Sequence, residues 1–278
     1  MTMNDLAKQT MKLLGENYIC ETVKVRKNNT IHEGIKLVEI NSEVAPIVYP
    51  RKEDDAYSIR DEYFKHVDKF DGIKDFKNYL MDWSSVKDNL YVRIVENADY
   101  AADFVNWKVC NVYAIPYVLA PAKLNGTVNV TAPLLKSWGI TEEKLREIAT
   151  ANTTESAVLY SLDSFFMNKN TNLLTEWNKE NSSFNPEQPG FYFLTNKECL
   201  FGAGCILSDK VNSILTKMFP KGYYILFSSI HEALIAPHSL PKGELIKTVS
   251  EANAQILDPE DALPCLTYEY KDGHLIIS

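Results

Sequence analysis

Paired β-rich segments, each pair joined by a short turn, recur along the chain, and helical segments separate the pairs. Tyr18–Lys27 and Ile31–Ile40 flank the polar turn Lys27–Thr30, and Leu266–Tyr270 and Leu275–Ile277 close the chain in the same way. A tight turn joins antiparallel neighbours, whereas parallel strands need a crossover of a dozen or more residues. The sequence therefore predicts an α+β fold in which helices accompany antiparallel sheets.

Helix starts are marked by side chains that can accept a hydrogen bond from the first free backbone N–H groups. Thr141 precedes Glu142 and Glu143, and Ser208 precedes an apolar face at helical spacing, so both are expected to be N-caps. We expect Asn4 to cap a first helix. Apolar residues at helical spacing predict further helices at 56–70, 73–83 and 244–257.

Two further apolar stretches predict strands. Val109–Leu119 is apolar on both faces, and Pro116 is expected to place it at a sheet edge or a bulge, because proline has no N–H for the ladder. Phe191–Leu194 and Cys199–Ile206 are expected to form a second hairpin. The predicted core of this C-terminal region consists of Phe193, Leu200, Ile206, Val211, Leu215, Ile225, Leu234, Val249 and Ile256.

A length of 278 residues favours two domains. We expect an N-terminal α+β lobe at 1–125 and a C-terminal α+β lobe at 126–278, with a polar loop at 178–190. Both lobes show the order helix, paired strands, helix, paired strands, helix. The stretches 28–34 and 196–202 share the pattern Asn-x-x-apolar-x-x-Gly. This similarity has two explanations, an internal duplication or the general preference of hairpins for Asn and Gly.

Charge and hydropathy exclude several classes of partner. The chain has 29 Lys and Arg against 37 Asp and Glu, a net charge of −8, and its densest basic cluster is only Lys24, Arg26 and Lys27. Nucleic acids and anionic membranes need larger cationic surfaces, so we expect neither as a partner. The sequence has no apolar signal segment and no stretch long enough to span a bilayer. Five cysteines without a CxxC pair agree with a cytoplasmic protein.

Common cofactor and metal motifs are missing. No Walker-type phosphate loop occurs, and Gly202-Ala203-Gly204 lacks the third glycine of a dinucleotide-binding loop, because Leu207 stands there. The glycines are better explained by close backbone packing. His231-Glu232 begins like a zinc motif, but Ile235 occupies the second ligand position. We predict no cofactor and no metal.

One polar segment stands between two apolar strands. Ser228, Ser229, His231 and Glu232 bring hydroxyls, an imidazole and a carboxylate into five residues. This segment is either a ligand or catalytic corner, or a turn whose side chains satisfy backbone groups. In an extended segment His231 and Glu232 would point to opposite faces, which favours the turn. We keep these four residues as candidate binding residues and name no catalytic residue.

The chain resembles an uncharacterised bacterial family, a domain of unknown function common in gut anaerobes. The similar pieces are 27–29 with Gly34, 134–140 leading to Ala149 and 152–153, 194–196 with 201–203, and 228–232, the most specific piece. The chain departs from the family pattern at Phe227, where we expect proline, and in Val109–Leu119, which lacks the expected Pro-His and acidic residues. The resemblance implies kinship and a shared fold, without a reaction.

Two functional hypotheses follow from these observations. The first is a cytoplasmic, non-enzymatic protein- or peptide-binding protein of a chaperone-like or accessory kind, because strong catalytic motifs are missing and the element order resembles that of bacterial secretion chaperones. The alternative is a hydrolase that uses the Ser228–Glu232 corner. The sequence identifies neither a substrate nor a partner.

Overall fold

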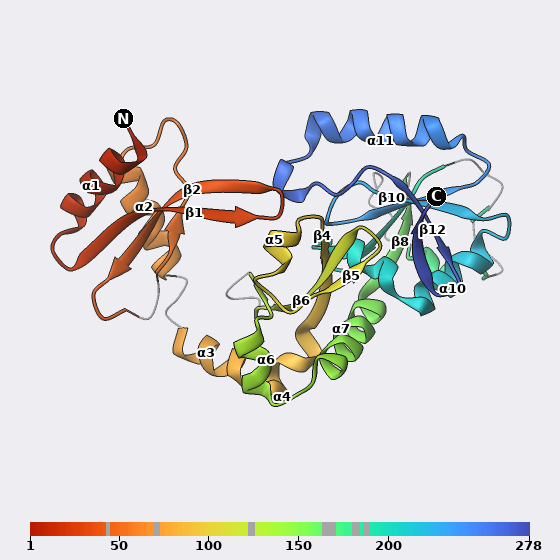
Figure 1. Cartoon of the computed structure of the whole chain (residues 1–278), viewed down its shortest axis with the longest axis horizontal. Helices are drawn as coiled ribbons and strands as arrows, with labels where there is room; N and C mark the ends of the chain where they lie inside the picture. The colour runs from red at the N-terminus through yellow and green to blue at the C-terminus, as the bar shows by residue number, and fades with distance from the viewer. Residues whose placement is uncertain (43–44, 69–72, 122–125, 163–170, 180–183, 186–189) are drawn as a thin grey trace. The chain divides into compact units, whose positions relative to one another are not determined.

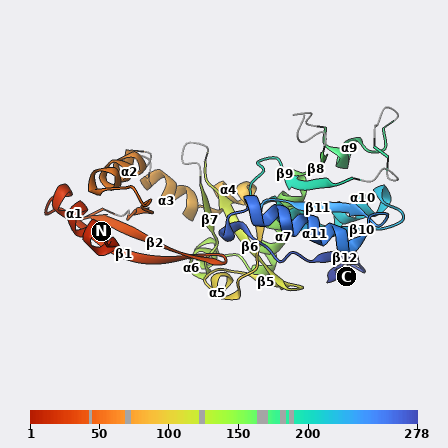
Figure 2. The ribbon, with the colours of Figure 1, turned by 90° about the horizontal axis from the view of Figure 1, so that it is seen from above.

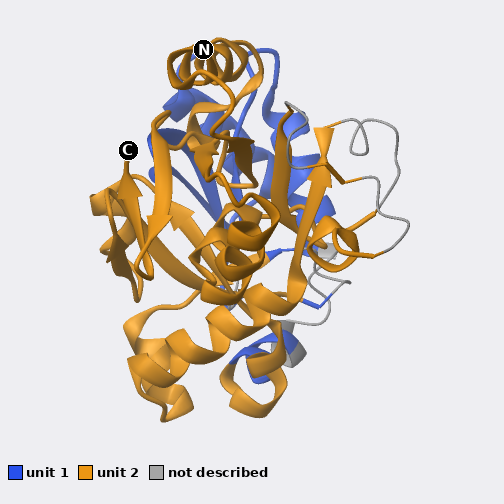
Figure 3. Ribbon diagram, turned by 90° about the vertical axis from the view of Figure 1, so that its right-hand side faces the viewer, with its two compact units in different colours: residues 1–80, 121–126 blue, residues 81–120, 127–278 orange. Residues whose placement is uncertain are grey.

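The chain divides into two compact units. The computed structural model describes residues 1–42, 45–68, 73–121, 126–162, 171–179, 184–185 and 190–278. Unit 1 consists of Met1–Leu80 with Pro121–Gly126, and unit 2 of Met81–Ala120 with Thr127–Ser278 (Figure 3). Both units contain helices and antiparallel sheets, so the predicted α+β class is confirmed.

Unit 1 packs helices against a three-stranded sheet of order β1-β2-β3 (Figure 1). Leu6 and Ala7 of the first helix and Ile59 and Tyr63 of the second meet Leu37 of the sheet in one apolar cluster. The elements are α1 (Met3–Leu14), β1 (Tyr18–Lys27), β2 (Thr30–Glu39), β3 (Ile47–Val48) and α2 (Ala56–Asp68), followed by α3 (Ile73–Met81) at the border with unit 2.

A six-stranded antiparallel sheet of order β13-β12-β10-β11-β9-β8 forms one part of unit 2. Helix α11 (Lys242–Ile256) lies along this sheet (Figure 2) and packs Leu245 and Val249 on Leu226 and Leu234. The strands are β8 (Ala157–Ser161), β9 (Tyr192–Asn196), β10 (Tyr223–Phe227), β11 (Ala233–Pro237), β12 (Thr267–Lys271) and β13 (His274–Ile277). The short α9 (Leu173–Glu176) and α10 (Asp209–Met218) complete this part.

A four-stranded sheet forms the second part of unit 2. Strand β6 (Val112–Leu119) is central, with β4 (Leu90–Val95) on one side and β5 (Trp107–Val109) and β7 (Thr127–Asn129) on the other. The expectation that Pro116 marks a sheet edge was wrong. Strands β5 and β7 pair with the same side of β6, and Pro116 lies in the gap between them. Pairing with β5 ends at Ala114 and pairing with β7 begins at Tyr117, so the missing N–H of Pro116 interrupts neither ladder.

The outer edge of β4 is closed by α7 (Glu142–Ser156) and by the 3₁₀ helix η2 (Gly202–Leu207). The Asn152 amide donates to the Leu90 carbonyl at 2.9 Å, and the Val92 N–H donates to the Thr153 hydroxyl at 2.9 Å. A Cβ on Gly204 would lie 2.2 Å from the Val92 carbonyl oxygen. Only a glycine lets η2 approach this backbone so closely, which confirms the close-packing explanation of the glycine pair.

Most predicted elements are present, and two need correction. Thr141 and Ser208 are N-caps as expected, but Thr2 rather than Asn4 caps α1, in a capping box with Asp5. The predicted strand Cys199–Ile206 is wrong, because most of it belongs to η2, packed against β4. The remaining short elements are α4 (Trp83–Val86), η1 (Lys87–Asn89), α5 (Ala98–Ala101), α6 (Ala132–Trp138) and η3 (Pro259–Asp261).

The division of the chain differs from the expected lobes 1–125 and 126–278. Residues 81–120 fall into unit 2, because β4 packs on α7 and η2 from later in the chain. The described strands of residues 1–125 lie in a three-stranded and a four-stranded sheet, whereas those of residues 126–278 lie in the six-stranded sheet, apart from β7, which pairs with β6. These different strand orders contradict an internal duplication. Most of the predicted loop 178–190 lies outside the described residues.

The predicted C-terminal core is largely correct. Six of its nine residues are buried: Ile206, Val211, Leu215, Ile225, Leu234 and Val249. Phe193 and Leu200 are half-buried. Ile256 is 84% exposed, because the cluster that holds α11 on the sheet includes Leu245, Ile246 and Val249 but nothing from its last turn.

Candidate functional site

The predicted Ser228–Glu232 corner is a turn between β10 and β11. The Ser228 hydroxyl donates to the Glu232 carboxylate at 2.5 Å, and the Ser229 hydroxyl accepts from the His231 N–H at 2.9 Å. The hydroxyl of buried Ser229 thus satisfies a backbone group within the turn. The proton of Ser228 is directed to a carboxylate and not to the imidazole.

The His231 ring is engaged at both nitrogens. Its Nδ1 accepts the Phe201 backbone N–H at 3.2 Å, and its Nε2 lies 3.5 Å from the Asp261 carboxylate. Because Nδ1 is an acceptor, the proton of the neutral ring resides on Nε2 and faces Asp261. A base for Ser228 would need an unoccupied ring nitrogen, so these contacts do not form a nucleophile–base pair.

The segment before η2 depends on this turn. Phe201 has a φ of +57°, which is uncommon for a residue with a Cβ, and its N–H is held by His231. The Thr195 hydroxyl donates to the His231 carbonyl at 2.8 Å, and the Ala203 N–H donates to the Ile230 carbonyl at 3.3 Å. The turn therefore positions the chain from Thr195 to Ala203.

Arg93 also packs on the ring of Phe201. Its guanidinium carbon is 3.9 Å from the Phe201 ring centroid, while His231 stacks on Phe201 at 5.3 Å with 14° between the planes. Arg93 is 8% exposed, and its Nε has no hydrogen-bond partner among the described residues. Burial lowers the pKa of Arg93, and the Tyr100 and Tyr117 hydroxyls oppose this shift. The ring of Phe201 thus supplies a cation–π contact to a buried cation.

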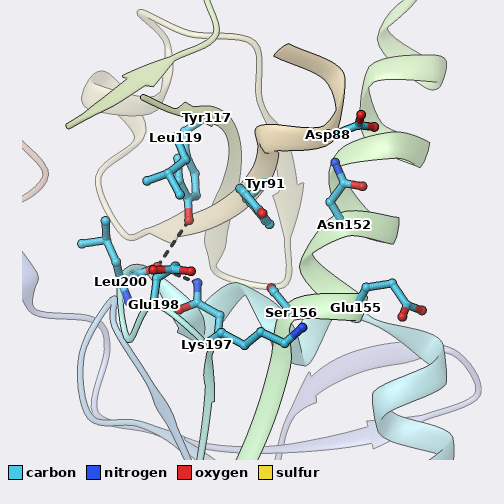
Figure 4. A pocket seen from close by; sticks show the side chains of 11 residues that line it. Asp88, Tyr91, Tyr117, Leu119, Asn152, Glu155, Ser156, Lys197, Glu198 and Leu200 are labelled. Atoms are coloured by element: carbon cyan, nitrogen blue, oxygen red, sulfur yellow. Dashed lines mark hydrogen bonds between the residues drawn. The ribbon is translucent and has the colours of Figure 1, made fainter. Parts of the chain in front are cut away.

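Next to this stack, unit 2 contains a pocket of about 170 Å³ (Figure 4). The rings of Tyr91 and Tyr117, from β4 and β6, lie side by side with centroids 5.9 Å apart. Helical segments contribute one wall and the chain after β9 another. The eleven lining residues are Asp88, Tyr91, Tyr117, Leu119, Asn152, Glu155, Ser156, Asn196, Lys197, Glu198 and Leu200.

Internal hydrogen bonds fix the pocket walls. Both groups of the Asn196 amide bond to the Leu200 backbone, at 2.7 and 3.0 Å, and the Tyr117 hydroxyl donates to the same Leu200 carbonyl at 3.3 Å. Burial raises the pKa of Tyr117, which keeps its phenol protonated as the donor. At the rim, the hydrogen bond from Lys210 lowers the pKa of Glu155. Because the hydrogen bonds of Asn196 and Tyr117 already hold the walls, the pocket is preformed.

Other parts of the described chain offer less defined sites. A wider hollow of about 360 Å³ in unit 1 is lined by Thr2, Lys24 and Glu33, among others. Its Lys24–Glu33 ion pair is exposed on both side chains. The described residues contain no cluster of three or more His, Cys, Asp or Glu side chains able to hold a metal ion. Within them, no helix combines the length and apolarity needed to cross a bilayer.

Sequence reasoning found the turn and missed the pocket beside it. His231 and Ser229 are close to the pocket wall that they position, whereas Tyr91, Tyr117 and Asn152 were not proposed as site residues. One signal was available, since Arg93 is a lone charge in the apolar strand Leu90–Val95. A buried charge inside an apolar strand marks a site with unusual surroundings.

Comparisons with known proteins identify the family. The model of a family of unknown function, DUF5688, matches residues 3–272. The chain belongs to this family, which confirms the kinship inferred from the sequence. No curated protein and no solved structure matches the chain.

Proposed function

We propose that this member of the family is a non-enzymatic protein- or peptide-binding protein of the cytoplasm, and that part of its partner enters the pocket of unit 2. The observation that carries the proposal is the preformed pocket, whose aromatic rings and amides are held in place before any ligand arrives. Preorganised walls lower the ordering cost of binding.

The four predicted binding residues act in this proposal through the wall that they support. Ser229 and His231 close the turn, and His231 holds the N–H of Phe201, which follows Leu200 of the pocket lining. Ser228 and Glu232 bond to each other. The turn is thus a positioning element and does not touch the ligand.

The test is the selection of peptides from a random library on the full chain, followed by titration of individual peptides. Leu119→Trp should fill the pocket and weaken binding by about tenfold or more, which corresponds to about 1.4 kcal/mol. Leu266→Trp, at a partly exposed site outside the pocket lining, is the matched control and should bind as the wild type does. Equal binding by both variants with unchanged melting temperatures would contradict the proposal.

The hydrolase remains a second candidate because one turn carries a hydroxyl, an imidazole and a carboxylate, with Asp261 close to His231. The hydrogen bond from Ser228 to Glu232 argues against it. A panel of fluorogenic ester and peptide substrates tests this alternative. We expect no turnover, whereas turnover that disappears in Ser228→Ala would establish the hydrolase.

A further inference from the structure

Most side-chain amide and hydroxyl donors of the pocket are already used by the protein. Both N–H groups of the Asn152 amide are occupied, by the carbonyls of Lys87 at 2.7 Å and Leu90 at 2.9 Å. The Asn196 amide nitrogen donates to Leu200, and the Tyr117 hydroxyl donates to the same carbonyl. Asn152 and Tyr117 therefore have no donor left for a ligand, and Asn196 has one of its two N–H groups committed.

The remaining aliphatic hydroxyl of the lining is also committed. Ser156 Oγ donates to the Thr153 carbonyl at 2.9 Å. A hydroxyl that donates keeps acceptor lone pairs, and so does the phenol of Tyr117. Asn152 Oδ1 receives no hydrogen bond from the part of the chain that the structure describes. The pocket therefore presents mainly acceptors.

The charges at the rim of the pocket also favour a ligand that donates hydrogen bonds. Asp88, Glu155 and Glu198 contribute three carboxylates against the single ammonium of Lys197. Glu155 is already paired with Lys210 at 2.8 Å. Asp88 and Glu198 make no ion pair with any residue the structure describes. The carboxylates without an ion pair would attract a positively charged ligand and repel an anion.

The size and the walls of the pocket suit an alkyl chain that ends in a cation. About 170 Å³ slightly exceeds the roughly 150 Å³ of an engineered cavity that accommodates benzene. The half-buried Tyr91 ring can attract a cation through its quadrupole, and Leu119 and Leu200 provide apolar contact. Tyr117 is 2% exposed and supports Tyr91 from behind. This combination matches neither a sugar nor a phosphate.

We propose that the pocket selects an alkylammonium or alkylguanidinium group, the end of a lysine or arginine side chain of a bound peptide. This inference rests on the proposed function and adds the chemistry that the pocket recognises. Asn152 Oδ1 and the carboxylate of Asp88, which lie on the same side of the pocket (Figure 4), accept hydrogen bonds from the cation. Glu198, on the opposite side, attracts it through its charge, and Tyr91 contacts its alkyl chain.

The experiment titrates the full chain with Nα-acetyl-lysine methylamide and follows the Asn152 side-chain amide by NMR. Nα-acetyl-norleucine methylamide, of similar shape without the charge, should bind about tenfold more weakly or not at all. Glu198→Gln and Asp88→Asn should each weaken lysine binding about two- to fivefold, the range of a solvent-exposed ion pair. The effect should shrink at 0.5 M salt, because screening acts within a few ångströms there.

Glu251→Gln is the matched control, since Glu251 lies exposed on α11 outside the pocket lining. It should bind the lysine probe as the wild type does. Equal binding of the lysine and norleucine probes, or preference for a glutamate analogue, would overturn the inference.

The outcomes separate this inference from the proposed function. If selected peptides bind in the pocket but lack basic residues, the peptide-binding function stands and the inference fails. If no peptide is selected while the lysine probe binds at Asn152, the chemistry of the pocket stands and its occupant is a free amine. If neither peptide nor probe binds, both proposals fail.

Discussion

A single residue, Phe201, links the polar turn to the four-stranded sheet. His231 holds its N–H and stacks on its ring, and Arg93 packs on the same ring at 3.9 Å. The cation–π contact offsets part of the cost of burying a guanidinium. Because the sequence places these residues 30 or more positions apart, local patterns give no means to predict that they meet.

The first prediction concerns His231→Ala. Loss of Nδ1 leaves the Phe201 N–H unpaired, which should cost about 1–3 kcal/mol. For a domain of this size each kcal/mol corresponds to about 2–4 °C in melting temperature. Calorimetry checks the shift, and His274→Ala, at an exposed histidine of β13, should melt as the wild type does. An unshifted melt with lost peptide binding would instead make His231 a ligand-contacting residue.

The second prediction concerns the two cysteines near η2. Cys205 is fully buried, and burial raises its pKa to about 12, whereas Cys199 is exposed. Iodoacetamide at about pH 8.5, close to the pKa of a free thiol, should modify Cys199 in the native protein and Cys205 only after unfolding. Peptide mass mapping measures both sites. Equal labelling of Cys205 and Cys199 in the native state would show that η2 opens readily.

The same pKa shift affects stability at alkaline pH. A cysteine thiol ordinarily has a pKa of 9.0, and burial raises the pKa of Cys205 in the folded chain to about 12. Above about pH 9 the unfolded chain loses this proton while the native chain keeps it, so the unfolded state is favoured as pH rises. The contribution of the neutral thiol to stability is complete below pH 9 and declines above it.

At the scale of elements, hairpins were predicted well because turn chemistry is local. The turns at 27–30 and 271–274 and the strands on either side formed as expected. The segment Cys199–Ile206 was assigned to a strand because a short apolar run has no period that separates a strand from a buried helix. Its true role, closing the edge of β4 as η2, depends on a contact across about 110 residues.

The third prediction tests that edge. Gly204→Ala would place a methyl group 2.2 Å from the Val92 carbonyl oxygen, so η2 or β4 must shift. Overpacking costs about 1–3 kcal/mol, and a contact with rigid backbone belongs at the upper end. Chemical denaturation measures the loss. Gly243→Ala, which has open space in α11, is the control and should be neutral or stabilising. Equal stability of the two variants would show that η2 does not depend on this contact.

At the scale of the whole molecule, the chain forms two compact units, and the residues of each unit are not continuous along the chain. Residues 81–120 belong with the C-terminal part because α7 supplies the partners that the edge of β4 lacks. The sequence predicted the turn at Ser228–Glu232 and did not predict the pocket, and the binding role of the four turn residues stays a prediction. The pocket assembles side chains from four separate regions, around 88–91, 117–119, 152–156 and 196–200, and no spacing rule connects them.

The fourth prediction concerns the independence of the two cores. Leu37 is fully buried in unit 1 among side chains of α1 and α2, and Leu226 is fully buried in unit 2 below α11. Leu37→Ala should cost about 2–5 kcal/mol, because the cavity it leaves is lined by well-packed neighbours. Since opening is governed by the contacts within each cooperative region, amide exchange should accelerate in β1 and β2 while β10 and β11 keep their protection. Hydrogen-exchange mass spectrometry measures both regions at once, and Leu226→Ala should give the reverse pattern. Acceleration in both units by either substitution would show that the chain unfolds as one cooperative body.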